Sequence, residues 1–370
     1  MLFRFIIALP MMVCLFWCIY FMVRMMRPGE ERGVTGSILL FYLAGTVLYT
    51  NHWLYFSGCT SFLGWWTYTL ANLSVYPLYY AYLLALTRTR STRELVILFI
   101  PTVFIALFAP VNHAVEWLSH DAVWLIARCC FALQVIWVWV RGFMLLRETQ
   151  RRLDDTYTDD RSYALRPTRV LLILIGITAA VSTLLNILGS SFFVGNQIII
   201  LPAVIMSALL YSLGYVAAHT VLPRETVAQE AEDKDDTPTQ DTTEETDLMM
   251  SRIADALREQ QLFANPHLTI QDMANAIGSN RTYVSRCINR RTGLSFSQYV
   301  ARYRVEHAQQ ILRSPDYATD HEAIAEAASL SGFSSDQTFY RVFKEQTDLT
   351  PLQYRQQNLS AKGASGHTDL

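Results

Sequence analysis

Lysine is nearly absent from this sequence, and cysteine is scarce. The first lysine is Lys234, and only six cysteines are spread over the 370 residues. None of them has the spacing to histidine that a zinc site needs, and Cys14, Cys18, Cys129 and Cys130 lie in apolar runs. We therefore expect neither disulfides nor a metal site.

The sequence also lacks the short motifs of common catalytic sites. It contains no HExxH, no nucleophile elbow and no phosphate-binding loop. No residues are left on which catalysis could rest, so we expect neither enzyme activity nor a cofactor.

Apolar residues are abundant but unevenly distributed. Hydrophobic residues make up 52% of the chain and the mean hydropathy is +0.20, which is too apolar for an ordinary soluble protein. Residues 1–222 hold fifteen arginines and ten acids among long apolar runs, whereas residues 248–370 hold thirteen basic and twelve acidic residues. The net charge of −2 therefore describes neither part.

Seven apolar stretches meet or approach the roughly 20 residues that a helix needs to cross a bilayer. They cover about residues 2–23, 35–57, 62–87, 95–111, 122–146, 168–189 and 197–220, and the fourth is the shortest. The first is too long for a cleaved signal peptide, and arginines follow it directly. The sequence thus predicts an all-α fold that begins with a seven-helix transmembrane domain, residues 1–222.

The arginines between these stretches indicate the orientation. The first, third and fifth loops hold Arg24, Arg27, Arg32, Arg88, Arg90, Arg93, Arg147, Arg151, Arg152, Arg161 and Arg166. The second, fourth and sixth loops hold none. Because positive residues collect on the cytoplasmic side, we expect a membrane protein with its N-terminus outside and everything after His219 in the cytoplasm.

Polar residues inside an apolar bundle are candidate functional residues. Arg128, His52, Asn72 and Asn186 lie in the outer half of the predicted bundle and could form a sensing pocket. Alternatively, Arg128 extends towards the bilayer surface and pairs with an acid at the rim, such as Asp121. The external loops are too short for a sensing domain, so a signal would be read within the membrane or by a partner.

An acidic segment, residues 223–247, follows the predicted spans. It holds ten acids, two basic residues and almost no large apolar side chains, so it cannot bury enough surface to offset its ordering entropy. We expect a flexible tether. A sharper alternative is that its acids compete with DNA for the basic surface that follows.

The soluble part contains a helix-turn-helix pattern. Thr269 and Asp272 form a capping box, Gly278 permits a tight turn, and Asn280 can cap the next helix. Ala274, four residues before the glycine, suits two closely crossed helices. The second helix carries several arginines and no acid, as DNA binding requires.

The same pattern recurs after a long amphipathic helix, SFSQYVARYRVEHAQQILRS. Ala328 and Gly332 are again four residues apart, and Ser334 or Ser335 can cap the helix that follows. The sequence therefore predicts two helix-turn-helix motifs joined by a helix.

The second motif, SGFSSDQTFYRVFKEQTDLTPLQYR, resembles the signature of the AraC/XylS family of bacterial transcription regulators. The matching positions are Gly332, Phe333, Phe343, Lys344, Thr350, Pro351, Tyr354 and Arg355. The resemblance covers about residues 248–357. Ser279 and Ser331 replace residues that are usually apolar in the family, and Asp348 stands where glycine is frequent. The resemblance implies that the helices at 281–291 and 335–346 enter successive major grooves of DNA.

The resemblance also implies roles for single residues. Expected base contacts are Arg281, Thr282, Ser285, Arg286, Asp336, Gln337, Thr338, Tyr340 and Arg341, and expected phosphate contacts are Arg290, Arg304 and Lys344. Arg286 and Arg341 are the strongest candidates because an arginine fork pairs with guanine. Tyr340 could equally pack against the DNA backbone, and Asp336 could simply favour the helix N-terminus.

Together with the resemblance, these features predict a transcription regulator of the bacterial inner membrane whose bundle senses a signal and whose C-terminal domain binds double-stranded DNA. The alternative is that the membrane part is only an anchor, a dimerisation module or a receptor for a membrane partner. A transporter with a DNA-binding tail is disfavoured because no internal repeat is evident. Expected partners are DNA and membrane lipid, with a small ligand or a second copy as further options. Residues 358–370 are expected to be a disordered tail.

Overall fold

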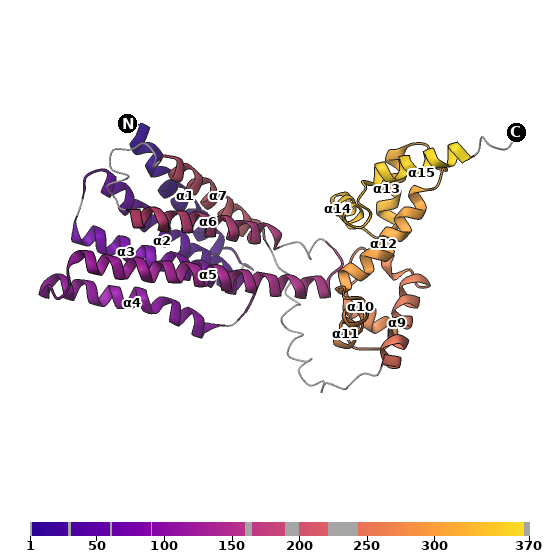
Figure 1. Ribbon diagram of the computed structural model, residues 1–370, viewed down its shortest axis with the longest axis horizontal. Helices are drawn as coiled ribbons and strands as arrows, with labels where there is room; N and C mark the ends of the chain where they lie inside the picture. Colours follow the sequence, from indigo (N-terminus) through magenta and orange to yellow (C-terminus); the bar gives the residue numbers. More distant parts are fainter. Residues whose placement is uncertain are drawn as a thin grey trace. The chain divides into compact units, whose positions relative to one another are not determined.

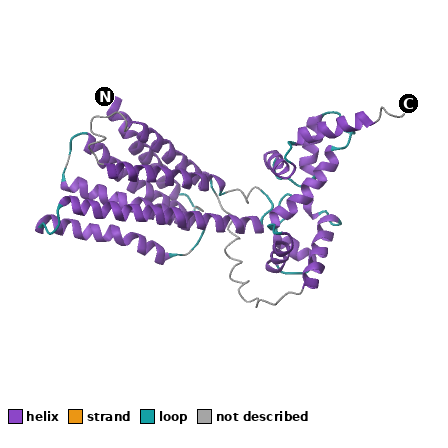
Figure 2. Cartoon of the chain, in the orientation of Figure 1, coloured by secondary structure: helices purple, strands orange, loops and turns teal. Residues whose placement is uncertain are grey.

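The computed structural model describes residues 2–28, 31–59, 61–89, 91–159, 165–188, 200–220 and 243–365. Every regular element in these ranges is a helix, so the predicted all-α fold class is confirmed (Figure 1). Figure 2 shows the same predominance of helix along the chain. Two compact units form: a bundle unit, Met1–Glu148 with Leu165–Leu222, and a helix-turn-helix unit, Thr149–Ala164 with Pro223–Leu370.

The bundle unit contains the helices expected in the apolar part of the sequence. They are α1 (Leu2–Met25), α2 (Arg32–Phe56), α3 (Phe62–Leu86), α4 (Thr92–Val115), most of α5 (His120–Thr156), α6 (Arg166–Leu188) and α7 (Ile200–His219). Helices that follow one another in the sequence pack together from α1 to α4, α6 packs on α7, and α7 returns to pack on α1.

Five of these helices, α1, α2, α4, α5 and α7, are long and apolar enough to cross a membrane. The fourth predicted stretch, 95–111, was too short, because α4 begins at Thr92 and continues for 24 residues until Glu116 ends it in a left-handed conformation. The helices α3 and α6 have 25 and 23 residues. In α3, tyrosine, threonine and asparagine side chains reduce the apolar character.

Two polar contacts join four helix ends in pairs in the bundle unit. Arg88, after α3, forms an ion pair with Glu31, before α2, at 2.5 Å. Arg24, near the end of α1, donates to the carbonyl of Ala218 in α7 at 2.6 Å. The first and third loops and the end of α7 therefore lie at the same end, as helices that alternate in direction require.

The helix-turn-helix unit begins inside α5, at Thr149, and resumes after the bundle unit. Its further helices are α9 (Thr243–Arg258), η6 (Leu262–Ala264), α10 (Ile270–Ile277), α11 (Arg281–Thr292), α12 (Phe296–Leu312), α13 (Asp320–Leu330), α14 (Asp336–Thr347) and α15 (Pro351–Ser365). The membrane domain had been predicted to include residues 149–164, which instead group with this unit.

Two further boundaries differ from the prediction. Residues 243–247 of the expected tether are the first turns of α9, whereas residues 223–242 lie outside the described residues. The last helix, α15, continues past residue 357 to Ser365, so residues 358–365 of the expected tail are helical.

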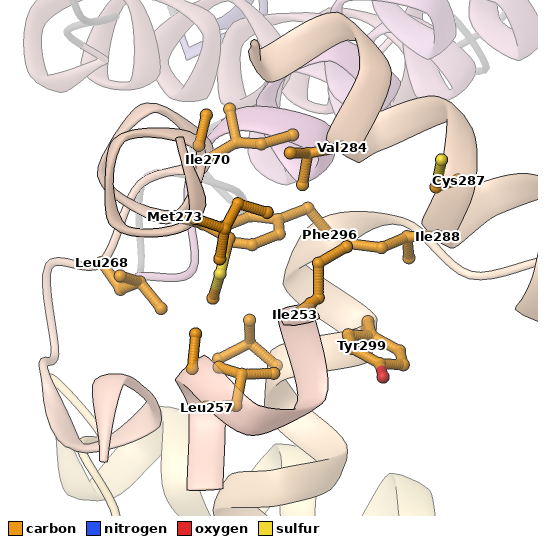
Figure 3. Packing of buried hydrophobic residues seen from close by; sticks show 14 of the residues in the cluster. Ile253, Leu257, Leu268, Ile270, Met273, Val284, Cys287, Ile288, Phe296 and Tyr299 are labelled. Carbon is orange, nitrogen blue, oxygen red and sulfur yellow. The ribbon is translucent and has the colours of Figure 1, made fainter. Parts of the chain in front are cut away.

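The first half of the helix-turn-helix unit packs around one apolar core. Figure 3 shows Ile253 and Leu257 of α9, Met273 of α10, Ile288 of α11 and Phe296 of α12 gathered in it. These five side chains are at most 1% exposed. Burying a large apolar side chain stabilises the fold by roughly 1.5–3 kcal/mol, so this core fixes the relative positions of α10 and α11.

The second half repeats this arrangement with α13, α14 and α15. Phe339 and Phe343 of α14 are fully buried, and their rings meet edge to face at 5.5 Å. The last part of α12 contributes Ala308 and Leu312 to this core. Figure 1 shows α12 running between the two halves, which share it as a common support.

The glycines of the two turns have the same backbone conformation but different surroundings. Gly278, between α10 and α11, has φ +61° and open space where a Cβ would lie. Gly332, between α13 and α14, has φ +74°, and a Cβ there would approach the carbonyl oxygen of Phe263 in η6 to 2.4 Å. Gly332 therefore also allows the two halves to meet closely.

We expect Gly332→Ala to destabilise the helix-turn-helix unit much more than Gly278→Ala. Both changes strain a left-handed backbone, which costs about 1–2 kcal/mol. Only Gly332→Ala also pushes a new Cβ against the backbone of η6, and such overpacking typically costs about 1–3 kcal/mol of stability. Hydrogen exchange of the amides of α12 and α14 in the purified full chain measures the difference, and equal loss of protection in the two variants would contradict it.

Candidate nucleic-acid interface

Side-chain caps fix where the first candidate recognition helix begins. Thr269 and Asp272 form the predicted capping box, in which the Thr269 amide donates to the Asp272 carboxylate at 2.9 Å. After the left-handed Gly278, the side chain of Asn280 accepts a hydrogen bond from the amide of Tyr283 at 2.7 Å. Only three residues, 278–280, therefore separate α11 from α10.

One side of α11 is buried and the other is polar. Val284, Cys287 and Ile288 are buried in the core. The predicted contact residues on the other side are Arg281, Thr282, Ser285 and Arg286, which are half-buried, and Arg290, which is exposed. They follow the spacing of one helix face, so the fold brings them together as a stripe.

The second candidate recognition helix, α14, starts at a serine cap. Ser335, not Ser334, is the cap, and its Oγ accepts a hydrogen bond from the amide of Thr338 at 3.3 Å. Asp348 ends the helix at φ +59°. Glycine adopts this left-handed conformation most readily and aspartate tolerates it, which explains a glycine preference at this position.

The structure separates the predicted contacts of α14. The exposed positions are Asp336, Gln337, Tyr340 and Lys344. Arg341 is half-buried and pairs with Glu345, one turn further on, at 3.5 Å. Thr338 is only 8% exposed, and its Oγ lies 3.2 Å from that of Ser335. It turns towards the core beside Phe339, which corrects its prediction as a base contact.

Arg304 is buried, so its prediction as a phosphate contact is wrong. The residue is 2% exposed, and its guanidinium group donates to the carbonyl oxygens of Phe263 at 2.8 Å and Asn265 at 2.7 Å. A third donor binds the carbonyl of Thr158 at 2.8 Å. Burial lowers the pKa of Arg304 to about 10, against the opposing effect of Asp159, so the group is cationic at neutral pH.

A second buried arginine supports the other half. Arg355 is 3% exposed, donates to Asp320 at 2.9 Å and donates to the carbonyl of Ser314 at 2.8 Å. Ser331, which departs from the apolar family pattern, is fully buried and lies 3.1 Å from Nδ1 of His307. The polar departure is therefore compensated by a hydrogen bond.

A separate cavity of about 150 Å³ lies inside the bundle unit and has mostly apolar and aromatic walls. His52 of α2 and Asn72 of α3, two of the predicted sensing residues, line it. So does Tyr79, whose hydroxyl is buried without a hydrogen-bond partner among the described residues. Arg128 is not among the lining residues, and its guanidinium carbon lies 4.9 Å from the ring of a neighbouring tryptophan. The side chain of Asn186 lies outside the described residues.

The contacts that residues 157–159 make with the rest of the helix-turn-helix unit were not predicted from the sequence. Thr158 donates to a carbonyl 110 residues further along the chain, a distance at which no local pattern is informative. The burial of Arg304 could have been predicted from helical spacing, because it lies four residues after Val300 and four before Ala308. Both of these are buried on one face of α12.

Comparison with known proteins agrees with this geometry. Residues 273–357 match the family described as "Helix-turn-helix domain". The chain therefore carries an AraC-type helix-turn-helix domain at its C-terminal end, which covers α11 to α14 and parts of the flanking helices.

Several bacterial regulators are similar to this part of the chain. The uncharacterized HTH-type transcriptional regulator YtdP of Bacillus subtilis is 33% identical over 93 residues, which cover 25% of this chain and 11% of that protein. The uncharacterized HTH-type transcriptional regulator YijO of Escherichia coli is 29% identical over 121 residues, 30% of this chain and 41% of that protein. Regulatory protein PocR of Salmonella typhimurium is 30% identical over 107 residues, 29% of this chain and 34% of that protein.

The matches thus span less than half of each of these relatives. A solved structure, the C-terminal domain of the two-component response regulator yesN from Fusobacterium nucleatum, aligns with 30% of this chain and 99% of its own at 21% identity and a TM-score of 0.25.

Two arginines of α11 provide a matched pair of substitutions. We expect Arg286→Ala to relax base preference at one position by about 1–3 kcal/mol. Arg290→Ala should weaken binding to all sequences nearly equally and lower the salt dependence by about one charge. Binding of the full chain to a panel of duplexes at two salt concentrations distinguishes these outcomes. Equal effects of both variants on every duplex would contradict the assigned roles.

Proposed function

We propose that this protein is a membrane-embedded bacterial transcription regulator that binds double-stranded DNA through α11 and α14. The observation that carries the proposal is the pairing of two capped helices in one unit, each with a buried apolar side and an outward polar side. The match of residues 273–357 to a helix-turn-helix family supports it. Arginine forks on α11 and α14 supply guanine recognition, and Arg290 and Lys344 supply phosphate contacts.

The proposal includes a cytoplasmic helix-turn-helix unit held at the inner membrane by the bundle unit. Five long apolar helices support the membrane location. Two contacts support a common end for the first and third loops, which are rich in arginine. They are the ion pair of Arg88 with Glu31 and the hydrogen bond from Arg24 to the carbonyl of Ala218. Positive residues gather on the cytoplasmic face, which gives this end its orientation.

Selection of genomic DNA fragments tests the DNA-binding function. The full chain, reconstituted in lipid nanodiscs, should enrich a discrete motif with two half-sites about one helical turn apart. Its affinity should fall steeply with salt because several phosphates are contacted. A double variant, Arg286→Ala with Arg341→Ala, serves as the control. Binding by the wild-type chain that is indifferent to sequence would refute the function.

The cavity of the bundle unit supports a sensing role. It combines aromatic walls with the imidazole of His52, the amide of Asn72 and the buried hydroxyl of Tyr79. A volume of about 150 Å³ is that of a benzene-sized cavity. The ligand class it fits is a small aromatic molecule with one polar group, which reaches the site from the membrane.

Indole is a suitable probe of this cavity. Indole should raise the melting temperature of the full chain in nanodiscs, and Asn72→Leu should weaken its binding about tenfold by removing one buried hydrogen bond. Asn51→Leu is the matched control, since Asn51 does not line the cavity and its amide donates to the carbonyl of Val47. Indole binding that is absent, or unaffected by Asn72→Leu, would contradict the proposed site.

The competing role for the bundle unit is that of an anchor, a dimerisation module or a receptor for a membrane partner. Replacement of the bundle helices by an unrelated membrane anchor tests whether anchoring is sufficient. Regulation that survives the replacement would assign anchoring, and loss of regulation with retained membrane attachment would exclude an anchor alone.

A further inference from the structure

The end of α5 and the residues after it are buried against the helix-turn-helix unit. Leu153 is 2% exposed, and Tyr157, Thr158 and Asp159 are 2%, 8% and 5% exposed. We refer to residues 153–159 as the docking segment. Burial of three consecutive residues in a connection between helices is unusual, because connections generally run over the surface.

The docking segment is held by polar contacts along its length. Tyr157 forms an isolated antiparallel bridge with Thr269, the cap of α10. The hydroxyl of Thr158 donates to the carbonyl of Leu268 at 2.7 Å. The carboxylate of Asp159 lies 3.2 Å from Nδ1 of His267. These contacts place the segment beside the loop that leads into the first helix-turn-helix motif.

Arg304 needs this segment to complete its hydrogen bonding. Its Nη1 donates to the carbonyl of Thr158 at 2.8 Å, and its Nη2 donates to the Thr158 hydroxyl at 3.0 Å. Within the rest of the unit, its Nε binds the carbonyl of Phe263 and its Nη2 also binds that of Asn265. A buried cation with unmade hydrogen bonds is strongly destabilising, so release of the segment leaves the centre of the unit incomplete.

We propose that the docking segment completes the DNA-binding unit, so that its release weakens DNA binding. The surface that receives it is formed by the loop at 265–269 and by Arg304 of α12, and its occupant is residues 153–159 of the same chain. The proposal rests on the proposed DNA-binding function.

The docking segment begins in the last turn of a long helix. It ends a single helix of 37 residues, α5, which at 1.5 Å per residue is roughly 55 Å long. The hydrocarbon core of a bilayer is only about 30 Å thick. α5 is therefore longer than a membrane span needs, and its last residues, up to Thr156, form the first part of the docking segment.

Thr158→Val tests the contact with little change of shape. Thr156→Val is the matched control, because the hydroxyl of Thr156 donates to the carbonyl of Arg152 in its own helix. Thr158→Ser keeps the hydroxyl and is the rescue variant. Two quantities are measured on each full chain in lipid nanodiscs: hydrogen exchange of residues 262–269 and α12, and affinity for the duplex selected by the wild-type chain.

We expect Thr158→Val to accelerate exchange in these segments about tenfold, since the hydrogen bond from Nη2 of Arg304 to the Thr158 hydroxyl is lost, and to weaken DNA binding by a similar factor. Thr156→Val and Thr158→Ser should remain close to wild type. Faster exchange with unchanged DNA affinity, or a Thr158→Val chain that behaves like Thr156→Val, would overturn the proposal. If the wild-type chain selects no sequence, the proposed function fails separately, and the exchange comparison still decides whether the segment docks.

Discussion

The guanidinium group of Arg304 is the interaction on which the helix-turn-helix unit depends. It sits in the middle of α12, the helix that both halves share, and binds the carbonyl oxygens of η6 and the loop after it. Phe333 of the second half lies 6.0 Å from the guanidinium carbon, and Thr158 approaches from α5. A buried cation needs hydrogen-bond acceptors for its N–H groups. The burial and hydrogen bonding of Arg304 therefore require all four of these parts of the chain to be in place. Through Phe263 and Phe333, the guanidinium group joins the two halves that carry the candidate recognition helices.

The two halves share one arrangement of helices but differ in the space around their turns. Each needs a left-handed glycine between two crossed helices, a polar cap at the start of the second helix and a row of apolar residues behind it. In the first half the turn faces open space, whereas in the second half Gly332 lies against the backbone of η6. The second turn is therefore constrained by the first half as well as by its own helices. The two motifs are therefore joined in two ways: both pack on α12, and the second turn contacts η6 of the first half.

Local rules were enough to predict the helices, the capping box at Thr269 and the glycine turns, because these depend on residues within one or two turns of each other. They also predicted the outward stripe of α11. They failed where burial is decided by distant parts of the chain. Thr338 and Arg304 were judged by their polarity, although both lie on buried helix faces. The cavity beside His52 and Asn72 is built from five helices, and only the packed bundle shows which polar residues meet there.

The contact between Thr158 and Arg304 has a consequence for biosynthesis. Thr158 leaves the ribosome 146 residues before the arginine that it binds, and two helices of the bundle are made in between. The helix-turn-helix unit therefore cannot complete the contacts of Arg304 until the residues on both sides of α6 and α7 have been made. Contacts of such high sequence separation form late. The burial of Arg304 is therefore one of the last steps in the folding of the chain, because it waits for the synthesis of α12 as well as of the helices before it.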